Sequence, residues 1–547
     1  MSFTVKYFDK EKKFDAPVKL LDLLEKKDQS YICARVNNRV RELTYEVHDN
    51  AKVEFLTVKD HDAISTYESS LRFILAMAFH RVAPELNVRF CYNVSRSVFV
   101  QILNEDVKAT PELVEAVDAE MKKIIQADYP LVRNVYTKEE AEKIYREHGL
   151  FDKLEILKYR PETTVHLYDC AGYMNYMFAR MVPSTGYLKD YALRFYPPGL
   201  IMQYPRSECG GKIPPFEDAP TFGKTLKESH TWGKIAGADS VAGINEHIHR
   251  DGVIDFIQLC EARHNRMLTQ LGDMIQGDID DIRLICIAGP SSSGKTTFSN
   301  RLRVELLSRG IKPIRISIDD YYLTKAEAPK DEDGKPDLES IEALDIELFN
   351  QNMLDLINGK EVQLPKFDFK LGKRVPGRKL KVGQNEPIII EGIHALNDRM
   401  TTLIPRHQKF KIFIAPQAQI NLDNANPVSI TDLRLLRRLV RDYKFRAASA
   451  EETFSMWPSV RRGEFKWIYD TQEGADFVYN SMLSYELCVM KKYAMPLLEA
   501  VDREDKYFPV AERLIRMLKY FDDMPDEWVP CNSLMREFIG GSCYEGA

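Results

Sequence analysis

Residues Arg283–Thr297 read RLICIAGPSSSGKTT, and this stretch decides the fold of the C-terminal half of the chain. Its first six residues predict an apolar strand, which runs directly into Gly289–Thr296, a loop with the spacing G-x-x-x-x-G-K-[ST]. A helix with an apolar face follows. A strand, a glycine-rich loop and a helix in this order form a P-loop, in which backbone N–H groups and the positive end of the helix surround phosphate oxygens. We therefore predict an ATP site here.

Each residue type in the loop has a role in this chemistry. Lys295 supplies a positive charge for the β- and γ-phosphates, and the Thr296 hydroxyl is a ligand for magnesium. The other residues predicted to contact the nucleotide are Gly289, Pro290, Ser291, Ser292, Ser293, Gly294 and Thr297. The alternative, a fortuitous Gly- and Ser-rich turn, does not account for the strand, lysine, hydroxyl and helix all in order. The predicted cofactors are ATP and Mg²⁺.

Downstream, two apolar strands each end in a carboxylate. Asp319 and Asp320 follow Ile314–Ile318, and Glu391 follows the run Pro387–Ile390. Carboxylates at the carboxyl ends of strands beside the P-loop strand face the same crevice, where they hold magnesium and accept a proton from an attacking hydroxyl. A single acid that closes a buried strand is costly to desolvate, which favours a metal-linked role for Glu391. For the two aspartates, a solvated turn is the alternative.

A basic helix is predicted over Asp432–Arg446, with charges that recur at three- and four-residue spacing. They are Arg434, Arg437, Arg438, Arg441, Lys444 and Arg446. Residues at this spacing share a helix face, so several arginines can close over a triphosphate as a mobile lid that also excludes water. A solvated charged face is the alternative. No NKxD motif for a guanine base stands at the expected place, which disfavours a GTPase.

The composition sets limits on the rest of the chain. The 547 residues are 44% hydrophobic and 29% charged, which is ordinary for a globular protein of three or four domains. With 76 basic and 82 acidic residues the net charge is −6, which argues against a protein that coats nucleic acid. Nine scattered cysteines without a CxxC pair predict reduced thiols. No signal peptide and no run long enough for a membrane helix are found, so a cytoplasmic protein is expected.

The pattern of elements divides the chain into segments. Residues 1–58 alternate short strands with an amphipathic helix around Leu20–Leu24, the pattern of a ubiquitin-like β-grasp domain. An α+β domain and linker follow over 59–225, a helical connector over 226–280, a P-loop domain over 281–499, and a helical extension with a frayed, Gly-rich tail over 500–547. The expected fold is multidomain α/β and α+β, with a parallel sheet flanked by helices in the P-loop domain. Other helices are predicted from spacing at Ser65–His80, Thr110–Ala127, Lys138–His148 and Gly252–Gln276.

Five motifs in order resemble the uridine kinase and phosphoribulokinase family. They are Gly289–Thr297, Ile316–Tyr322, Leu364–Phe369, Ile390–Gly392 and the arginine helix, and the resemblance covers about residues 281–495. It implies that Asp319 is the catalytic base and that Thr296, Asp319 and Glu391 hold magnesium. It also implies that Arg438, Arg441 and Arg446 contact the phosphates, and that Lys295 with Arg438 and Arg441 stabilises the transferred group.

The same resemblance places the acceptor beside Tyr322, Glu339, Phe367 and Asp368, with Glu339 in place of the family's sugar-binding aspartate. The pocket departs from the uridine kinase pattern at several positions. Phe367 replaces a tyrosine, Gly372 a histidine, Ala447-Ala448 a Gly-Arg pair and Met456 a glutamine. A site that discriminates a base by hydrogen bonds needs those donors and acceptors. The phosphoryl-transfer residues are therefore kept, while the acceptor is left open.

The first 225 residues resemble the N-terminal region of threonyl-tRNA synthetase. Ala34–Leu43 is similar to its β-grasp domain, and the region around Tyr168–Gly172 is similar to its editing domain. In that family the editing site binds a metal through an HxxxH pair, a Cys and a His. Here the helix Thr66–Phe73 has neither histidine, and Cys170 is followed four residues on by Met174. One ligand cannot hold zinc, so we predict no editing activity.

Three functions are open at this point. The leading one is an ATP- and Mg²⁺-dependent kinase that transfers the γ-phosphoryl group to a hydroxyl of a small molecule, with a nucleoside such as uridine as the default acceptor. The second is a kinase for a different sugar or polyol. The third is a nucleotide-switched, RNA-associated binding protein, which the net charge of −6 disfavours. No membrane partner is expected, and a homo-oligomer stays open.

Overall fold

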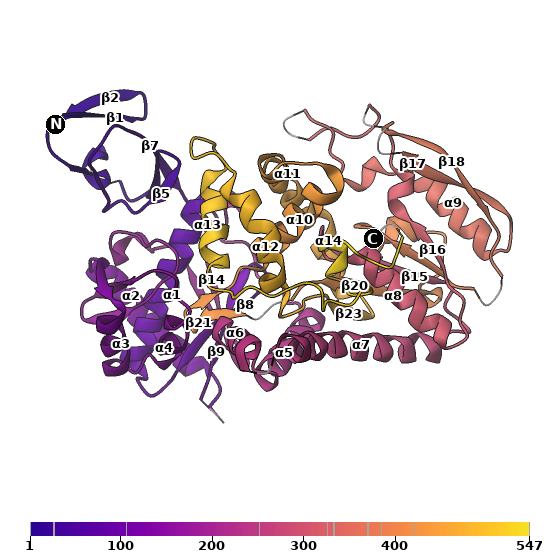
Figure 1. Cartoon of the computed structure of the whole chain (residues 1–547), viewed down its shortest axis with the longest axis horizontal. Helices are drawn as coiled ribbons and strands as arrows, with labels where there is room; N and C mark the ends of the chain where they lie inside the picture. The colour runs from indigo at the N-terminus through magenta and orange to yellow at the C-terminus, as the bar shows by residue number, and fades with distance from the viewer. Residues whose placement is uncertain are drawn as a thin grey trace.

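A five-stranded parallel sheet carries the P-loop in its centre (Figure 1). Its order is β16-β19-β15-β20-β23, and the registers of all four strand pairs are parallel. The strands are β15 (Leu284–Ala288), β16 (Ile314–Ser317), β19 (Ile388–Glu391), β20 (Lys409–Ala415) and β23 (Phe477–Asn480). Both faces of β15, β19 and β20 are buried, which explains why these segments read as nearly continuous apolar runs.

Alternate residues of the central strand bury against two different helical layers. Ile285 and Ile287 belong to the core that includes α7, α8, α10 and α12, whereas Leu284 and Cys286 face the layer that contains α9. These helices are α7 (Val253–Gly277), α8 (Lys295–Ser308), α9 (Ile346–Ile357), α10 (Ile430–Arg446) and α12 (Glu486–Glu499). Side chains alternate across a strand, so each face acquires its own core. The predicted architecture of a parallel sheet flanked by helices is confirmed.

The structure is a computed structural model, and it describes residues 2–25, 28–104, 107–250, 252–324, 326–331, 334–368, 371–383, 386–417 and 420–545. The indigo N-terminal segments lie at one end of the molecule, and the sheet with the P-loop lies towards the other (Figure 1). The yellow C-terminal helices α12 and α13 (Phe508–Leu518) lie between them. Within the described part of the chain, none of the helices combines the length and the apolar character needed to cross a membrane.

The first sheet has the order β2-β1-β7-β4-β5, with β1 and β7 parallel. Its strands are β1 (Phe3–Tyr7), β2 (Lys10–Phe14), β4 (Tyr31–Val36), β5 (Arg39–Arg41) and β7 (Ala51–Thr57). The amphipathic helix expected around Leu20–Leu24 is only a four-residue 3-10 turn, Leu20–Leu23. The backbone N–H groups of Leu20 and Leu21 donate to Tyr45 and Leu43 instead, so pairing with a distant segment replaces helical hydrogen bonds.

The region that follows combines helices with two antiparallel sheets. Helix α1 (His61–Val82) shares a hydrophobic core with the first sheet and with residues as far along as Tyr204, and Ala425 joins the same core. The sheets are β10-β11-β12 and β13-β14-β9-β8. Their strands are β8 (Val88–Val94), β9 (Ser97–Ile102), β10 (Val132–Thr137), β11 (Thr164–Cys170), β12 (Tyr173–Asn175), β13 (Ala192–Tyr196) and β14 (Gly199–Gln203). Further helices are α2 (Pro111–Ala127), α3 (Lys138–Glu147), α4 (Phe151–Leu157), α5 (Pro220–Ile235) and α6 (Val241–Arg250).

The C-terminal tail returns to the P-loop. Its last helix, α14 (Arg536–Ile539), packs on α10. Leu534 and Phe538 are fully buried. Their apolar side chains find a hydrophobic surface beside the P-loop. The glycine-rich tail that is expected to fray begins after them, at Gly540.

Candidate active site

The P-loop is shaped by two glycines at its ends. A Cβ at Gly289 would lie 1.9 Å from the carbonyl oxygen of Ile414, so only glycine fits beside β20. Gly294 has a φ of 88°, in the left-handed region, and caps the start of α8. Between them, the buried hydroxyls of Ser292 and Ser293 have no hydrogen-bond partner among the residues that the structure describes, and neither does that of Thr297. Unsatisfied buried donors at a helix N-terminus suit phosphate oxygens, so the loop fits the triphosphate of ATP.

The Lys295 side chain folds back onto the P-loop backbone. Its Nζ donates to the carbonyl oxygens of Gly289 at 2.9 Å and Pro290 at 3.1 Å. Burial lowers the pKa of Lys295, while the charges of Glu391 and Asp319 act against this shift. The ammonium group is thus held beside both predicted carboxylates.

Asp319 and Glu391 meet at the carboxyl ends of their strands. Glu391 ends β19 and is level with Ile287 of β15 and with Ser317 of β16, whose hydroxyl donates to Glu391 Oε1 at 3.3 Å. In the sheet, β19 lies next to the P-loop strand β15, and β16 lies next to β19. Glu391 therefore follows the first neighbour of β15, and Asp319 follows the second. Burial raises the pKa of Asp319 and raises that of Glu391 to about 7, with Lys295 opposing both shifts. Groups with pKa values moved towards neutrality are typical of catalytic sites.

The neighbouring Asp320 has a different role. Its Oδ1 accepts a hydrogen bond from Phe367 N at 3.2 Å and pairs with Lys366 at 3.3 Å. It therefore fastens the turn after β16 to strand β17 (Val362–Asp368). Of the two adjacent aspartates, Asp319 is the one that interacts with Lys295.

Oxygen ligands for magnesium are available at this point. Thr296 contributes a hydroxyl from the first turn of α8, and Asp319 and Glu391 contribute carboxylates. In the described part of the chain, no three His, Cys, Asp or Glu side chains form a cluster that could hold a metal ion by themselves. Mg²⁺ prefers oxygen ligands and usually keeps several waters and substrate phosphates in its shell. The residues present fit that mode of binding.

The arginines of α10 fall into two groups. Arg438, Arg441 and Arg446 gather around Asp442, which has no exposed side-chain surface; their nitrogens lie 3.2, 2.8 and 3.5 Å from its oxygens. Arg438 also donates to the Ser291 hydroxyl at 2.9 Å, which brings this group to the P-loop. Asp442 was not singled out from the sequence, although its four-residue spacing from Arg438 and Arg446 was a visible signal.

The other two arginines brace the loop. Arg434 donates to the Ser291 carbonyl at 2.9 Å and pairs with Glu464. Arg437 donates to the Ser292 carbonyl at 3.3 Å and pairs with Glu486. Both are buried, so a solvated face is wrong for them. Helix α10 is packed into the core through Leu433, Leu436 and Leu439 and is not a free lid in this structure.

The predicted acceptor residues Tyr322, Phe367 and Glu339 lie near one another, and Tyr322 is close to Asp319. The rings of Tyr322 and Phe367 are 6.0 Å apart, and the Tyr322 hydroxyl donates to the Leu338 carbonyl at 3.2 Å. Burial raises the pKa of Tyr322, and so do the charges of Asp319 and Glu339. Burial and the nearby Glu464 raise the pKa of Glu339 to about 7.

Asp368 sits at the end of the β17–β18 hairpin, with β18 covering Lys373–Leu380. Its Oδ1 accepts a hydrogen bond from Leu371 N at 3.0 Å, so this aspartate shapes the hairpin turn. Phe369 of the same motif lies outside the described residues.

One residue at the P-loop was not anticipated. Glu537, in α14, accepts a hydrogen bond through Oε2 from the backbone N–H of Thr297 at 3.0 Å. The two residues are 240 positions apart. No local pattern around Glu537 signals this contact, which depends on how the C-terminal segment folds back.

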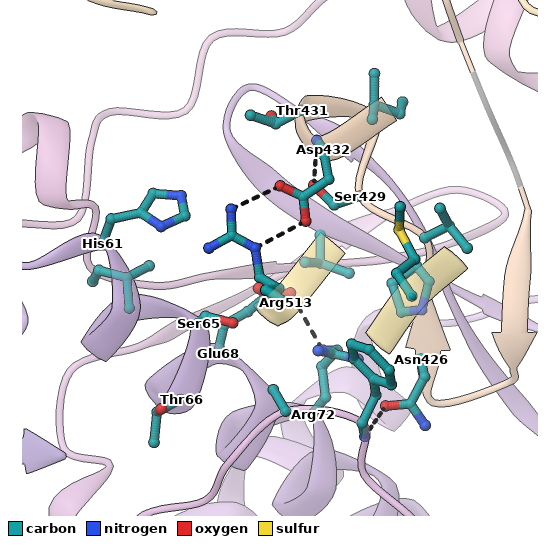
Figure 2. Close-up of a pocket in the computed structure, with 18 of the residues that line it drawn as sticks. His61, Ser65, Thr66, Glu68, Arg72, Asn426, Ser429, Thr431, Asp432 and Arg513 are labelled. Carbon is teal, nitrogen blue, oxygen red and sulfur yellow. Dashed lines mark hydrogen bonds and ion pairs between the residues drawn. The ribbon is translucent and has the colours of Figure 1, made fainter. Parts of the chain in front are cut away.

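A cavity of about 270 Å³ lies away from the P-loop, between α1, α10 and α13. Figure 2 shows the Arg513 guanidinium directed at the carboxylate of Asp432, with His61, Thr66 and Arg72 on the facing wall. Arg513 is 3.0 Å from Asp432 and 3.7 Å from Asp62, so it joins α10 to α1. Thr66 lies on α1, whose two histidines, His61 and His80, do not form an HxxxH pair. Burial raises the pKa of the Cys170 thiol to about 11.

Comparison with known proteins separates the two halves of the chain. The family model described as "Phosphoribulokinase / Uridine kinase family" matches residues 284–487. The uridine kinase of Staphylococcus aureus (strain JH9) is 31% identical over 196 residues, which is 36% of this chain and 86% of that protein. Among solved structures, a "Possible Uridine Kinase" from Bacillus stearothermophilus has 16% identity and a TM-score of 0.25, covering 38% of this chain and all of its own.

The N-terminal region is similar to threonine–tRNA ligases. That of Carboxydothermus hydrogenoformans is 27% identical over 163 residues, which is 30% of this chain and 26% of the ligase. Threonine–tRNA ligase 1 of Bacillus subtilis is 30% identical over 164 residues, which is 30% of this chain and 25% of the ligase. The chain thus spans about a quarter of the length of these ligases.

Proposed function

Because the chain belongs to the phosphoribulokinase and uridine kinase family, we propose that it is an ATP- and magnesium-dependent kinase that phosphorylates a hydroxyl group of a small molecule. The observation that carries the proposal is the placement of Lys295. Its ammonium group is held on the P-loop by the Gly289 and Pro290 carbonyls, within electrostatic range of Asp319 and Glu391, which follow the two strands on one side of β15. A positive charge for phosphates and a carboxylate for a proton are both needed for phosphoryl transfer, and here they are neighbours.

The residues divide the reaction between them. The N–H groups of Gly289–Thr297 bind the phosphates of ATP, with Arg446 as a further contact. Asp319 takes the proton from the acceptor hydroxyl, whose oxygen forms a bond to the γ-phosphorus while the bond to the β–γ bridging oxygen breaks and ADP leaves. Lys295, Arg438 and Arg441 stabilise the negative charge on the transferred group. Magnesium held by Thr296, Asp319 and Glu391 would neutralise phosphate charge in the same place.

The acceptor is bound by the residues beyond Asp319. Tyr322 and Phe367 offer an apolar and aromatic wall, and Glu339 offers a carboxyl group for hydrogen bonds to hydroxyls. A nucleoside such as uridine is the first acceptor to test. A different sugar or polyol is the second, because Phe367 and Met456 stand where the uridine kinase pattern has hydrogen-bonding side chains.

The proposal is tested by measuring ADP release with Mg-ATP in the presence of a panel of nucleosides, sugars and polyols. We expect one class of acceptor to stimulate ADP release over the background hydrolysis, and the stimulated rate to be lost in Asp319→Asn. If no acceptor stimulates the wild-type protein, or if the stimulated rate survives in Asp319→Asn, the proposed reaction or its base is wrong. Mass spectrometry of the product identifies the phosphorylated hydroxyl.

A further inference from the structure

The C-terminal segment, residues 526–540, lies on the P-loop. Its helix α14 packs against α10 (Figure 1). Glu537 is only 8% exposed and accepts a hydrogen bond from Thr297 N at 3.0 Å. Thr297 is in the first turn of α8, where backbone N–H groups have no helical partner and point towards an incoming anion. The Glu537 carboxylate thus uses a donor that the proposed function assigns to a phosphate oxygen of ATP.

A second contact covers the end of the loop. A Cβ at Gly294 would lie 1.7 Å from Leu534 Cδ2, so the Leu534 side chain rests directly on the glycine backbone. Leu534 is fully buried there. The charge of Glu537 is also close enough to shift the pKa values of Lys295, Glu391 and Arg315. A carboxylate and a leucine therefore fill space in the same electrostatic environment in which a nucleotide would bind.

We propose that the C-terminal segment is an autoinhibitory plug, in which Glu537 takes the place of a nucleotide phosphate and competes with ATP for the start of α8. This inference rests on the proposed function, because it assumes that the P-loop binds ATP. It concerns the regulation of that site and leaves the acceptor open. ATP binds once the segment has left the loop, so the measured affinity is the intrinsic affinity reduced by the fraction of molecules in which the loop is open.

The contacts that hold the plug lie outside the parallel sheet. The guanidinium of Arg437 lies 4.9 Å from the centre of the Phe538 ring, and the Ser533 hydroxyl is 3.2 Å from that of Tyr485. Lys444 of α10 donates to the carbonyl of Ile539. Arg437 and Lys444 belong to α10, and Tyr485 is the residue just before α12. Arg437 also donates to the Ser292 carbonyl. The same arginine therefore contacts both the plug and the P-loop that the plug covers.

The test compares nucleotide binding by full-length variants. A fluorescent ATP analogue with Mg²⁺ is titrated into the wild type, Glu537→Gln, Glu537→Ala and the control Glu527→Gln. Glu527 is an exposed acid of the same segment, so the control removes an equal charge away from the loop. We expect Glu537→Ala to bind the analogue roughly tenfold more tightly, since a hydrogen bond to a charged group is lost only from the closed state. Glu537→Gln should gain less, because its amide oxygen can still accept from Thr297 N, and Glu527→Gln should match the wild type.

Hydrogen exchange measured on the wild-type protein tests the displacement of the plug without any mutation. Saturating Mg-ATP should increase exchange at residues 533–539, because the plug is displaced. Unchanged or slower exchange there would overturn the inference, as would weaker binding by Glu537→Ala. If the wild type and all variants bind the ATP analogue with the same dissociation constant, the autoinhibitory role is wrong and the proposed function stands. If no variant binds ATP although circular dichroism shows that all are folded, the proposed function fails and the plug fails with it.

Discussion

Asp319 and Glu391 are both affected by the charge of Lys295, but they differ in how exposed their carboxylates are. Glu391 is 7% exposed at the end of a central strand, whereas Asp319 is half-buried in the short turn that follows β16. Burial raises the pKa of both, and Lys295 limits the rise. The more accessible carboxylate is the one that can meet a diffusing acceptor, and the enclosed one is better placed to hold a metal ion. The two carboxylates thus differ in accessibility, which suits Asp319 to the proposed role of base and Glu391 to the proposed role of metal ligand.

The roles of the two adjacent aspartates can be separated by mutation. Asp319→Asn should lower kcat by roughly 10²–10⁴-fold, the usual contribution of a general base, with ATP binding retained. Asp320→Asn is the matched control, since an amide oxygen can still accept the hydrogen bond from Phe367 N. Steady-state kinetics and an ATP titration measure both effects. Equal losses in the two variants would contradict the assignment of Asp319.

The raised pKa of Glu391 has a consequence for stability. Its value is about 7 in the folded chain and about 4.5 for the free side chain, so between these pH values the folded state binds more protons than the unfolded state. The free energy of unfolding must then fall as pH rises through this window, by roughly 1–3 kcal/mol in total. Glu391→Gln should flatten this decline. Thermal unfolding between pH 5 and pH 8 in EDTA tests it, and parallel profiles for wild type and variant would refute it.

Helix α10 shows how one element serves several functions along its length. Asp432 in its first turn pairs with Arg513. Arg434 and Arg437 in the next turn hold the carbonyls of the P-loop. The last turns carry Arg438, Arg441 and Arg446 around Asp442. Because the apolar side chains of the helix are packed in the core, these positions are fixed relative to one another. The helix therefore supplies its arginines in a preset arrangement, which is the condition for electrostatic stabilisation of a transferred group.

Asp442 is the residue on which that arrangement depends. Asp442→Asn leaves three arginines without their shared carboxylate, and breaking a buried pair of this kind costs roughly 3–5 kcal/mol. We expect a lower melting temperature together with a higher KM for ATP, because the arginines repel one another and leave the phosphate side. Glu499→Gln, at an exposed position near the end of α12, is the control and should change neither quantity. A stability loss with unchanged kinetics would show that the arginines do not act on the nucleotide.

At the scale of the whole molecule, α13 connects the two halves of the chain. Arg513 of this helix pairs with Asp432 at the start of α10 (Figure 2). It also lies 3.7 Å from Asp62 at the start of α1. Arg39 of β5 pairs with Glu512 at 3.4 Å, so the first sheet reaches the same helix. The C-terminal extension is thus placed between the N-terminal region and the sheet with the P-loop (Figure 1). A partly enclosed ion pair that joins three segments couples them more strongly than an exposed pair would.

Replacing Arg513 tests this connection. Arg513→Ala leaves Asp432 without its partner and should destabilise the protein by roughly 1–3 kcal/mol. Hydrogen exchange should then increase at the starts of both α1 and α10, since both lose a contact. Arg503→Ala, an exposed arginine of the same extension, is the control. An increase confined to α13 would mean that the helix does not join the two halves.

Short sequence patterns predict much of the candidate active site. The spacing in Gly289–Thr296 predicts the loop, and the acids that close two apolar strands predict Asp319 and Glu391. Helices α1, α2, α3 and α7 lie where the spacing placed them, within a few residues. The helix at Leu20–Leu24 was wrong, because backbone pairing with Leu43 and Tyr45 outweighed local periodicity. The sequence also does not show which arginines of α10 brace the P-loop and which lie near the phosphate side. Arg434 and Arg437 are distinguished by their partners Glu464 and Glu486, which are far away in the sequence.

By itself, therefore, the sequence determined the phosphate-binding loop, its lysine and the two strand-end carboxylates, because each is encoded by a short pattern whose geometry is fixed by neighbouring residues. Only the tertiary structure decided which arginines brace the loop, which gather at Asp442, and that Glu537 reaches Thr297 across 240 positions. Contacts of this range depend on how whole elements pack and carry no local signature. The start of α8 offers the same N–H groups to a phosphate or to a carboxylate, and the fold of the C-terminal segment brings a carboxylate to it.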